Sequence, residues 1–407
     1  MLYRLEVENF LSVRDKQVLD LTIAPNVPDP DTRYAPIFKG SKLRAPKVIA
    51  LYGKNASGKT NFLRALEFVL TLVRIQKISP GWPVPVYRFN DELSASRPIR
   101  LAIEFGGAMN LSPGVIERYH AGDAVEWGIY RYELVIEVTD GLPTRILEEN
   151  LRQRPNGQGK WQRVFERDAD GNIKDSPSFS VTGFRHLQNT LGPTVSVLAS
   201  FALFQHPVAQ VFVKAANTYF FQGVTALSDD HRHIIDYMTA TPEIVTALER
   251  ELSRIDVGVE SVCMRDSAQG KQPMFKHSGL QHEMPLHMQS NGTQRFIKIF
   301  PIIHAALNNG GGAIIDELDI TIHAAIIPDL MRWFYNPARN PHDAQLWFTC
   351  HAASALDDLN KEEVVICDKD HMGRTTVHSL MDVKVRRGEN LYRKYLSGAL
   401  GGIPQIG

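Results

Sequence analysis

One stretch of the chain has the residue types and the spacing of a phosphate-binding loop. In "GKNASGKTNF", Gly53, Gly58, Lys59 and Thr60 occupy the fixed positions of the pattern G-x-x-x-x-G-K-[ST]. In such a loop, backbone N–H groups surround phosphate oxygens, the lysine reaches the β- and γ-phosphates, and the threonine hydroxyl ligates Mg²⁺. The residues predicted to contact a nucleotide are Gly53, Asn55, Ala56, Ser57, Gly58, Lys59, Thr60 and Asn61. We therefore expect a nucleoside triphosphate and Mg²⁺ at this loop.

The flanks of the loop are those that such a site requires. Before it, the apolar run "VIALY" (48–52) is typical of a buried strand. After it, apolar residues recur at helical spacing from Phe62 to Leu70. The alternative is a chance match in a turn between a strand and a helix, and two correct flanks argue against it.

A second candidate site is the acidic pair that ends another apolar run. In "GGGAIIDELDITIH" (310–323), Asp316 and Glu317 follow a predicted buried strand, which is a Walker B pattern. Asp316 would hold the Mg²⁺ shell and Glu317 would polarise the attacking water. The two roles need different surroundings, which neighbouring residues at a strand end can have because they point to different sides. An acidic pair of this kind is common, so it indicates a nucleotide site only together with the phosphate-binding loop far upstream.

Two further stretches complete the set. "MQSNGTQRF" (288–296) places Ser290 and Gly292 in a polar turn just before a predicted helix, an arrangement that can bind an anion. "AQLWFTCH" (344–351) is a predicted strand that ends in His351. Taken alone, that histidine would be interpreted as structural.

In this order, the stretches resemble the ABC-type ATPase heads of the SMC-like and RecF-like group. Within that group they are most similar to the single-chain AAA family ATP-binding proteins of bacteria, which include OLD-like and abortive-infection (AbiL-type) ATPases. The stretches that carry the resemblance are "LEVENFLSVRD", "YGKNASGKTNFLRAL", "SNGTQRF", "IIDELDITIHAAIIPDL", "FTCHAASALD" and "YRKYLSGALGGIP". They cover about the first 75 and the last 130 residues.

The resemblance implies an ATPase that uses ATP and Mg²⁺ and works as at least a homodimer. Thr60 and Asp316 would bind the metal, and Glu317 and His351 would be catalytic, with His351 at the γ-phosphate. Ser290 and Gly292, at the signature position, would close on the phosphate that Lys59 of a second subunit holds. The resemblance further implies a sensor or switch in bacterial anti-phage defence (abortive infection), with a separate nuclease or toxin as effector.

The sequence departs from the family pattern at several positions. The signature reads Ser-Asn-Gly-Thr where transporters have Ser-Gly-Gly-Gln, and Leu11 stands where related heads often carry arginine. We identify no Q-loop glutamine in the middle of the chain. Residues 78–285 lack sustained heptads and contain many glycines and prolines, which excludes a long coiled-coil arm.

The elements that position these residues follow from hydrophobic patterning. We predict an α/β fold, a P-loop NTPase of ABC-ATPase type with a mixed β-meander and helical insertion. Its predicted parts are residues 1–78 and 286–407, the two halves of the ATPase domain, and 79–285, an insertion that partly continues the ATPase sheet. Strands are predicted at 2–10, 16–24, 99–105, 130–138, 145–154 and 257–264, a hairpin at "PNGQGK" with a second turn at "DADGN", and helices within 195–221 and 242–255. Residues 25–36, the stretch from 78 and residues 265–282 are predicted as irregular loops.

Three polar clusters allow more than one interpretation. "SDDHRHIIDY" (228–237) could bind a metal, and we favour the start of a helix. The basic and aromatic stretch "RQRPNGQGKWQRVFER" (152–167) could touch nucleic acid or form a solvated hairpin, and both remain open. Asp368 and Asp370 follow an apolar strand as in metal-dependent nucleases, and we interpret "DKD" as a turn.

Composition limits the alternatives. Forty-five basic and forty-five acidic residues give no net charge, which neither supports nor excludes a nucleic-acid partner. Three widely separated cysteines indicate a reducing compartment, and no apolar run is long enough to cross a membrane, so we expect a cytoplasmic protein without a membrane partner. The rival hypotheses are a DNA-repair or recombination ATPase of the SMC or RecF type, and a binding module in which ATP is structural. Glu317 argues against the latter.

Overall fold

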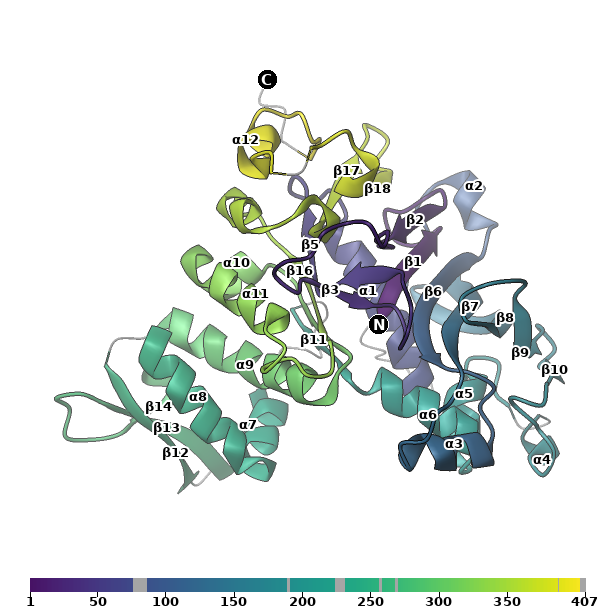
Figure 1. Ribbon diagram of the computed structural model, residues 1–407, viewed down its shortest axis with the longest axis horizontal. Coiled ribbons are helices and arrows are strands. Elements are labelled where there is room, and N and C mark those ends of the chain that lie inside the picture. The colour runs from purple at the N-terminus through teal and green to yellow at the C-terminus, as the bar shows by residue number, and fades with distance from the viewer. Residues whose placement is uncertain are drawn as a thin grey trace.

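Two large sheets pack on opposite sides of one helix. The computed structural model describes residues 1–75, 86–188, 191–223, 231–255, 258–267, 270–386 and 388–402. One sheet has the strand order β10-β9-β8-β7-β6-β1-β2, and the other has the order β11-β15-β16-β5-β17-β18. The helix α1 (Lys59–Arg74) shares one hydrophobic core with both sheets (Figure 1). The predicted α/β class is confirmed.

The second sheet carries the candidate site. Its strands are β11 (Tyr219–Gln222), β15 (Gly312–Ile315), β16 (Gln345–Thr349), β5 (Val48–Tyr52), β17 (Val364–Lys369) and β18 (Thr375–Ser379). All neighbours pair in parallel except β17 and β18, which pair antiparallel. Every residue of β5, β15 and β16 is buried, because helices cover both faces of a parallel sheet. The carboxyl ends of these strands therefore meet at one edge, where ligands bind in sheets of this kind.

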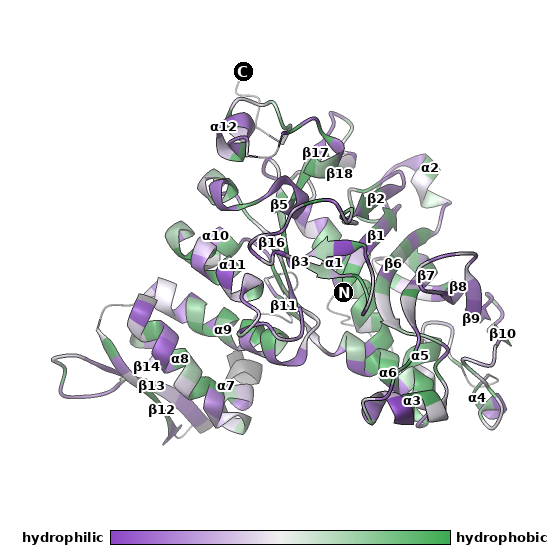
Figure 2. Cartoon of the chain, in the orientation of Figure 1, coloured by the Kyte–Doolittle hydropathy of each residue, from purple (hydrophilic) through white to green (hydrophobic). Residues whose placement is uncertain are grey.

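The first sheet confirms the predicted meander. Its strands are β1 (Leu2–Glu8), β2 (Gln17–Asp20), β6 (Ile99–Ala108), β7 (Trp127–Thr139), β8 (Leu142–Pro155), β9 (Gln162–Arg167) and β10 (Ile173–Lys174), all antiparallel. The meander thus continues the sheet that begins with the N-terminal strands. Figure 2 shows hydrophobic residues where α5 (Val197–Leu203) and α6 (Pro207–Ala216) lie beside β6, and a polar outer edge at β9.

On the other face of the parallel sheet, α9 (Asn291–Asn309) and α11 (Ile327–Tyr335) share a second core with β5, β15 and β16. Beyond α9 lies a lobe that we call the hairpin lobe, on the far side of the molecule from the antiparallel sheet (Figure 1). It consists of α7 (His231–Ala240), α8 (Pro242–Ile255), β12 (Val259–Ser267), β13 (Gly270–His277) and β14 (Met284–Pro285). The lobe occupies the chain between the end of β11 and the start of α9.

The remaining described elements are short. They are β3 (Tyr34–Pro36), β4 (Arg44–Pro46), α2 (Glu92–Ala95), α3 (Pro113–His120), α4 (Arg185–Gln188), η2 (Leu286–Met288), α10 (Leu318–Thr321), η3 (Ala324–Ile326), η4 (Ala353–Asp358), η5 (Lys361–Glu363), η6 (Leu380–Asp382) and α12 (Leu391–Leu396). The predicted helix start in 228–237 corresponds to α7, although residues 228–230 lie outside the described part. The irregular stretch predicted to begin at residue 78 lies outside the described residues up to residue 85.

Three predictions of local structure were wrong. Residues 219–221 end the helical run as the strand β11, because aromatic residues fit a pleated surface and β15 offers a parallel partner. Residues 270–277 form β13 rather than a loop, because alternate residues Pro273 and Phe275 are buried against the lobe. The "DKD" stretch is only partly a turn, since Asp368 and Lys369 belong to β17.

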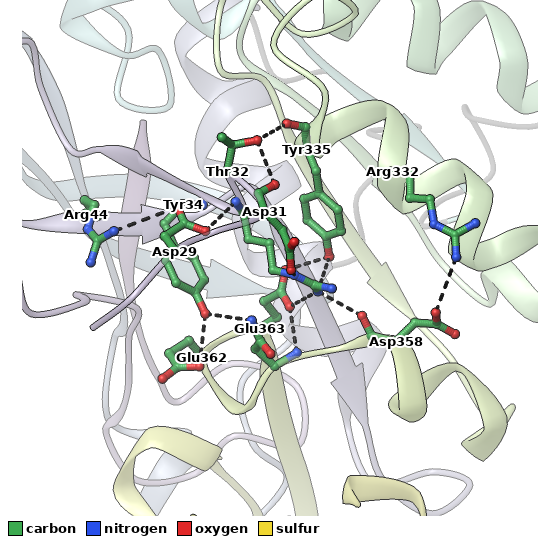
Figure 3. Close-up of polar contacts among 12 residues, drawn as sticks. Asp29, Asp31, Thr32, Tyr34, Arg44, Arg332, Tyr335, Asp358, Glu362 and Glu363 are labelled. Carbon is green, nitrogen blue, oxygen red and sulfur yellow. Dashed lines mark hydrogen bonds and ion pairs between the residues drawn. The ribbon is translucent and has the colours of Figure 1, made fainter. Parts of the chain in front are cut away.

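The predicted loop 25–36 is not irregular throughout, because it ends in β3, which pairs with β4. It is also not fully exposed, because its second half is anchored to the entry of β17 (Figure 3). Arg33 Nη1 donates to Glu363 Oε2 at 2.8 Å, and Tyr335 Oη donates to Glu363 Oε1 at 2.6 Å. Tyr34 is buried, and its hydroxyl donates to Glu362 Oε2 at 3.1 Å. These contacts fix the turn that leads into β17, next to the central strand β5.

In the described part of the chain, no single helix has the length and apolar character to cross a membrane. One sharply bent pair, Val197–Leu203 with Pro207–Ala216, would pass on those two criteria.

Candidate functional site

A pocket of about 760 Å³ lies at the carboxyl edge of the parallel sheet. Its lining residues are Asn55, Ala56, Ser57, Gly58, Lys59, Thr60, Asn61, Arg64, Asp316, Glu317, Asp319, Ile320, Thr349, His351 and Lys369. Most of the predicted loop residues thus face the predicted Asp316, Glu317 and His351 across one cavity. Gly53 is the one predicted loop residue that does not line the pocket.

The loop backbone requires glycine at two of its fixed positions. Gly53 has φ +150° and Gly58 has φ +101°, which side chains rarely adopt. A Cβ atom at Gly53 would lie 2.2 Å from the carbonyl oxygen of Cys367, and one at Gly58 would lie 2.3 Å from Thr375 Oγ1. The tight turn therefore brings the loop directly to the start of α1, whose N-terminal N–H groups favour an anion.

Lys59 is the cation at the centre of the loop. Its side chain is buried, and Nζ donates to the carbonyl oxygens of Gly53 at 2.9 Å and Lys54 at 3.2 Å. Burial lowers the pKa of Lys59, and the nearby carboxylates of Asp316 and Glu317 oppose that shift. A phosphate in the pocket would further favour the charged ammonium.

Asp316 and two threonine hydroxyls form an oxygen-rich cluster below the loop. Thr60 Oγ1 donates to Asp316 Oδ2 at 2.9 Å, and Thr349 Oγ1 donates to Asp316 Oδ1 at 2.6 Å. The backbone N–H of Glu317 donates to Thr349 Oγ1 at 2.7 Å. A carboxylate beside a hydroxyl is the donor set that Mg²⁺ binds together with substrate phosphates, so Thr60 and Asp316 fit this ion.

Glu317 has an unusual backbone conformation. Its φ of 51° and ψ of 54° lie in the left-handed region, where a residue with a side chain is strained. The turn separates Glu317 from the Asp316 cluster while keeping both residues on the pocket wall. A carboxylate placed in this way is a candidate general base.

The strand predicted to end in His351 ends at Thr349, and His351 lies two residues beyond it, exposed on the pocket wall. Its backbone N–H donates to Asp319 Oδ2 at 3.0 Å, and the N–H of Ala352 donates to the same oxygen at 2.9 Å. Asp319, in α10, therefore ties the end of β16 to the acidic pair. Asp319 was not predicted as a site residue, although it is the second aspartate of "DELD" and lies three residues after Asp316.

Ser12 and Thr375, far apart in the sequence, brace the phosphate-binding loop. Asn61 Nδ2 donates to Ser12 Oγ at 2.6 Å, and Thr375 Oγ1 donates to the carbonyl oxygen of Ser57 at 2.9 Å. Their hydroxyl oxygens are 2.7 Å apart. No local pattern marks either residue, because their proximity depends on the packing of β18 beside β2.

Gln222 contacts the site from outside the pocket wall and was not predicted. It ends β11, and its carbonyl oxygen accepts from the N–H of Asp316 at 2.9 Å. Its position is the carboxyl end of the strand that pairs with β15. Recognition of β11 as a strand would have identified it, but the aromatic run was assigned to a helix.

The signature residues do not line this pocket. Ser290 caps α9, since its Oγ accepts from the N–H of Thr293 at 3.1 Å. Ser290 and Gly292 are both exposed. Arg295 Nη1 donates to the carbonyl oxygen of Ile320, which links α9 to a residue of the pocket wall.

The other polar clusters form no metal site among the described residues, where no group of three or more His, Cys, Asp and Glu side chains has the required arrangement. Asp229 and Asp230 lie outside the described residues. Asp368 accepts from the N–H of Gly402, and Asp370 closes a turn with Arg374. In the basic and aromatic stretch 152–167, the Arg154 guanidinium stacks on Trp161, with its central carbon 4.1 Å from the ring centroid.

The fold and the pocket define a P-loop protein of the ABC-ATPase type. Residues 48–357 match the family described as "AAA domain, putative AbiEii toxin, Type IV TA system", and the chain belongs to this family. No curated protein matches the chain.

Several solved structures are similar to the chain. The SMC head domain from Thermotoga maritima has 12% identity and a TM-score of 0.41, covering 94% of this chain and 99% of that one. The SmcHead bound to the C-winged helix domain of ScpA has 13% identity and a TM-score of 0.44, covering 93% and 97%. The Smc head domain with an extended coiled coil, bound to the C-terminal domain of ScpA derived from Pyrococcus furiosus, has 13% identity and a TM-score of 0.43, covering 98% and 99%.

Proposed function

We propose that the protein binds ATP with Mg²⁺ in this pocket and hydrolyses it. The observation that carries the proposal is the contact between the Thr60 hydroxyl and the Asp316 carboxylate beneath the loop that holds Lys59. Three elements far apart in sequence, α1, β15 and β16, bring these groups together. When bound, Mg²⁺ supplies positive charge at the phosphate oxygens.

The residues of the chain have separate roles in the proposed reaction. Lys59 binds the β- and γ-phosphates and neutralises the charge that develops on them. Glu317 accepts a proton from water as the water oxygen attacks the γ-phosphorus and the bond to the β–γ bridging oxygen breaks, giving ADP and phosphate. His351 contacts the γ-phosphate from the end of β16, and Thr349 holds Asp316 in orientation.

The proposed working unit is at least a dimer with shared sites. Ser290 and Gly292 are exposed at the N-terminus of α9, a helix of 19 residues, and lie outside the pocket of their own chain. An exposed helix N-terminus favours an anion. We infer that these residues close on the nucleotide that Lys59 of a second copy holds.

We further propose that this ATPase is the sensor or switch of a cytoplasmic bacterial anti-phage (abortive-infection) system with a separate effector, a nuclease or toxin. The family description, which names a toxin and a type IV toxin–antitoxin system, supports this step. We propose the division into residues 1–78, 79–285 and 286–407, with the middle part carrying the docking surface for the effector. That part includes the hairpin lobe, which lies in sequence between β11 and α9.

The first test is nucleotide binding by Lys59→Ala. Loss of the charge-assisted contacts to phosphate should abolish measurable binding of a fluorescent ATP analogue and Mg²⁺-dependent ATP hydrolysis. Lys54→Ala, which removes a half-buried lysine side chain from the same loop, is the matched control. Wild-type affinity in Lys59→Ala would refute ATP binding at this loop.

A further inference from the structure

A segment remote in sequence lies against the first residue of the phosphate-binding loop. We call residues 391–402, which contain α12 and the glycine-rich turn after it, the α12 segment. The ring of Tyr395 packs edge-on against that of Tyr52, with centroids 5.7 Å apart. Tyr52 ends β5 and directly precedes Gly53, so α12 rests on the entrance to the loop.

Hydrogen bonds hold the glycine-rich turn to α12 and to β17. Tyr395 Oη donates to the carbonyl oxygen of Gly402 at 3.1 Å. The N–H of Gly402 donates to Asp368 Oδ1 at 2.9 Å. Tyr395 thus joins the glycine turn to Tyr52, the residue before the loop, while Asp368 holds the turn in place.

Gly53 is enclosed on two sides. Gly402 has φ +72°, and a Cβ atom on it would lie 3.1 Å from the Cα atom of Gly53. On the other side, a Cβ atom on Gly53 would lie 2.2 Å from the carbonyl oxygen of Cys367 in β17. Glycine at position 402 is therefore favoured both by its own backbone conformation and by the proximity of the loop.

Gly53 also contacts the lysine of the phosphate-binding loop. The carbonyl oxygen of Gly53 accepts from Lys59 Nζ at 2.9 Å. A continuous path of contacts therefore leads from Tyr395 and Gly402 through Gly53 to the cation that is expected to bind phosphate.

We propose that the α12 segment positions the phosphate-binding loop, with Tyr395 and Gly402 as positioning residues, so that ATP affinity depends on the docking of this segment. The inference rests on the proposed ATP site and adds a way to regulate it. Undocking of α12 releases Gly53 and lowers affinity for nucleotide. By linkage, bound nucleotide stabilises the docked segment to the same extent.

The first test compares two glycines of the segment. Gly398→Ala and Gly402→Ala introduce the same substitution at similar positive φ angles, +78° and +72°. At Gly398 a Cβ atom meets nothing within 4 Å, whereas at Gly402 it presses on Gly53. Gly402→Ala should weaken binding of a fluorescent ATP analogue about tenfold or more relative to Gly398→Ala.

The second test compares two tyrosines of α12 and leaves the fold intact. Tyr395→Phe removes only the hydroxyl that bonds to Gly402, and it keeps the ring against Tyr52. Loss of this bond, which holds Gly402 beside Gly53, should weaken ATP binding about three- to tenfold. Tyr392→Phe, the same change on the partly buried neighbour in α12, should bind as wild type does.

Kinetics distinguish positioning from general destabilisation. KM for ATP should rise in Gly402→Ala and Tyr395→Phe, while kcat at saturating MgATP stays near that of wild type. Amide hydrogen exchange in residues 391–396 of wild type should slow when the ATP analogue is added. Suppose that wild type binds ATP and Lys59→Ala does not. Equal ATP affinities of the two glycine variants, and of the two tyrosine variants, would then overturn this inference but not the proposed function. Absence of binding by wild type would instead overturn the proposed function.

Discussion

Asp316 and Glu317 are neighbours in the chain, but their surroundings suit them to different tasks. Asp316 accepts hydrogen bonds from Thr60 and Thr349, which leaves it in a cluster of hard oxygen atoms. Glu317 adopts a left-handed backbone conformation that turns it away from this cluster. The strain at Glu317 is tolerated because Thr349 holds its N–H and Asp319 holds the end of β16 beside it.

At the residue scale, Glu317→Gln should retain ATP binding and slow hydrolysis by about 10²–10⁴-fold, because glutamine cannot accept the proton of the attacking water. Single-turnover hydrolysis and binding of a fluorescent ATP analogue measure the two effects separately. Glu260→Gln, an exposed glutamate in the hairpin lobe, controls for the substitution. Normal turnover in Glu317→Gln would place the base elsewhere.

The residues in and around the pocket differed in how far the sequence could reveal them. Lys59 and Thr60 stand in one local motif and Asp316 and Glu317 in another, and the order of the two motifs along the chain predicted that they line one site. Ser12 and Thr375 carry no such signal, because a hydroxyl is common and its meaning here depends on packing between remote strands. Gln222 was missed for a different reason, since it follows an aromatic run whose secondary structure was predicted wrongly.

The elements that hold the site were predictable where hydrophobic periodicity was unambiguous. The strands β5, β15 and β16 and the helices α1 and α9 follow directly from apolar runs and helical spacing. β11 and β13 did not, because a short aromatic or amphipathic run is compatible with strand, helix or loop until its partner is known. The anchoring of loop 25–36 could not be predicted either, because the hydrogen-bond partners of Arg33 and Tyr34 lie more than 300 residues later in the chain.

At the element scale, the buried anchor of β17 should make stability depend on pH. Burial raises the pKa of Glu363 to about 7, against the opposing charge of Arg33. A carboxyl group with a higher pKa in the folded state contributes stability that is present below its unfolded pKa and is lost as pH rises through about 7. Between about pH 5 and pH 8, wild type should therefore lose about 2–4 kcal/mol more stability than Glu363→Gln.

Urea unfolding of wild type and Glu363→Gln at a series of pH values measures this difference. The same substitution at the exposed Glu117 is the control. Parallel stability curves for wild type and Glu363→Gln would show that Glu363 does not change its protonation in this range. Because Glu363 lies far from the pocket wall, ATP affinity serves as a second control.

At the scale of the whole molecule, the nucleotide site is assembled from both ends of the sequence around a long middle part. The meander 99–174 completes the sheet that packs over α1, whereas the hairpin lobe projects from the opposite side (Figure 1). Composition alone could exclude a coiled-coil arm for this middle part, but it could not predict how its two regions divide between sheet and lobe. In sequence, the described residues of the lobe lie between the strand that ends in Gln222 and the helix that begins after Ser290.

The last prediction concerns the shared site of the proposed dimer. Ser290→Arg places a bulky cation at the exposed start of α9, outside its own pocket, and should abolish hydrolysis while ATP binding by the isolated chain remains. Lys59→Ala abolishes hydrolysis from within the pocket. In a mixed dimer of the two variants, one site receives Lys59 from one chain and Ser290 from the other, and is intact. Equal mixing should therefore restore about a quarter of the wild-type sites. Ser96→Arg, an exposed serine near α2, should leave hydrolysis unchanged and is the control for the added charge. Absence of recovery in purified mixed dimers would exclude the shared site and leave Ser290 a helix cap.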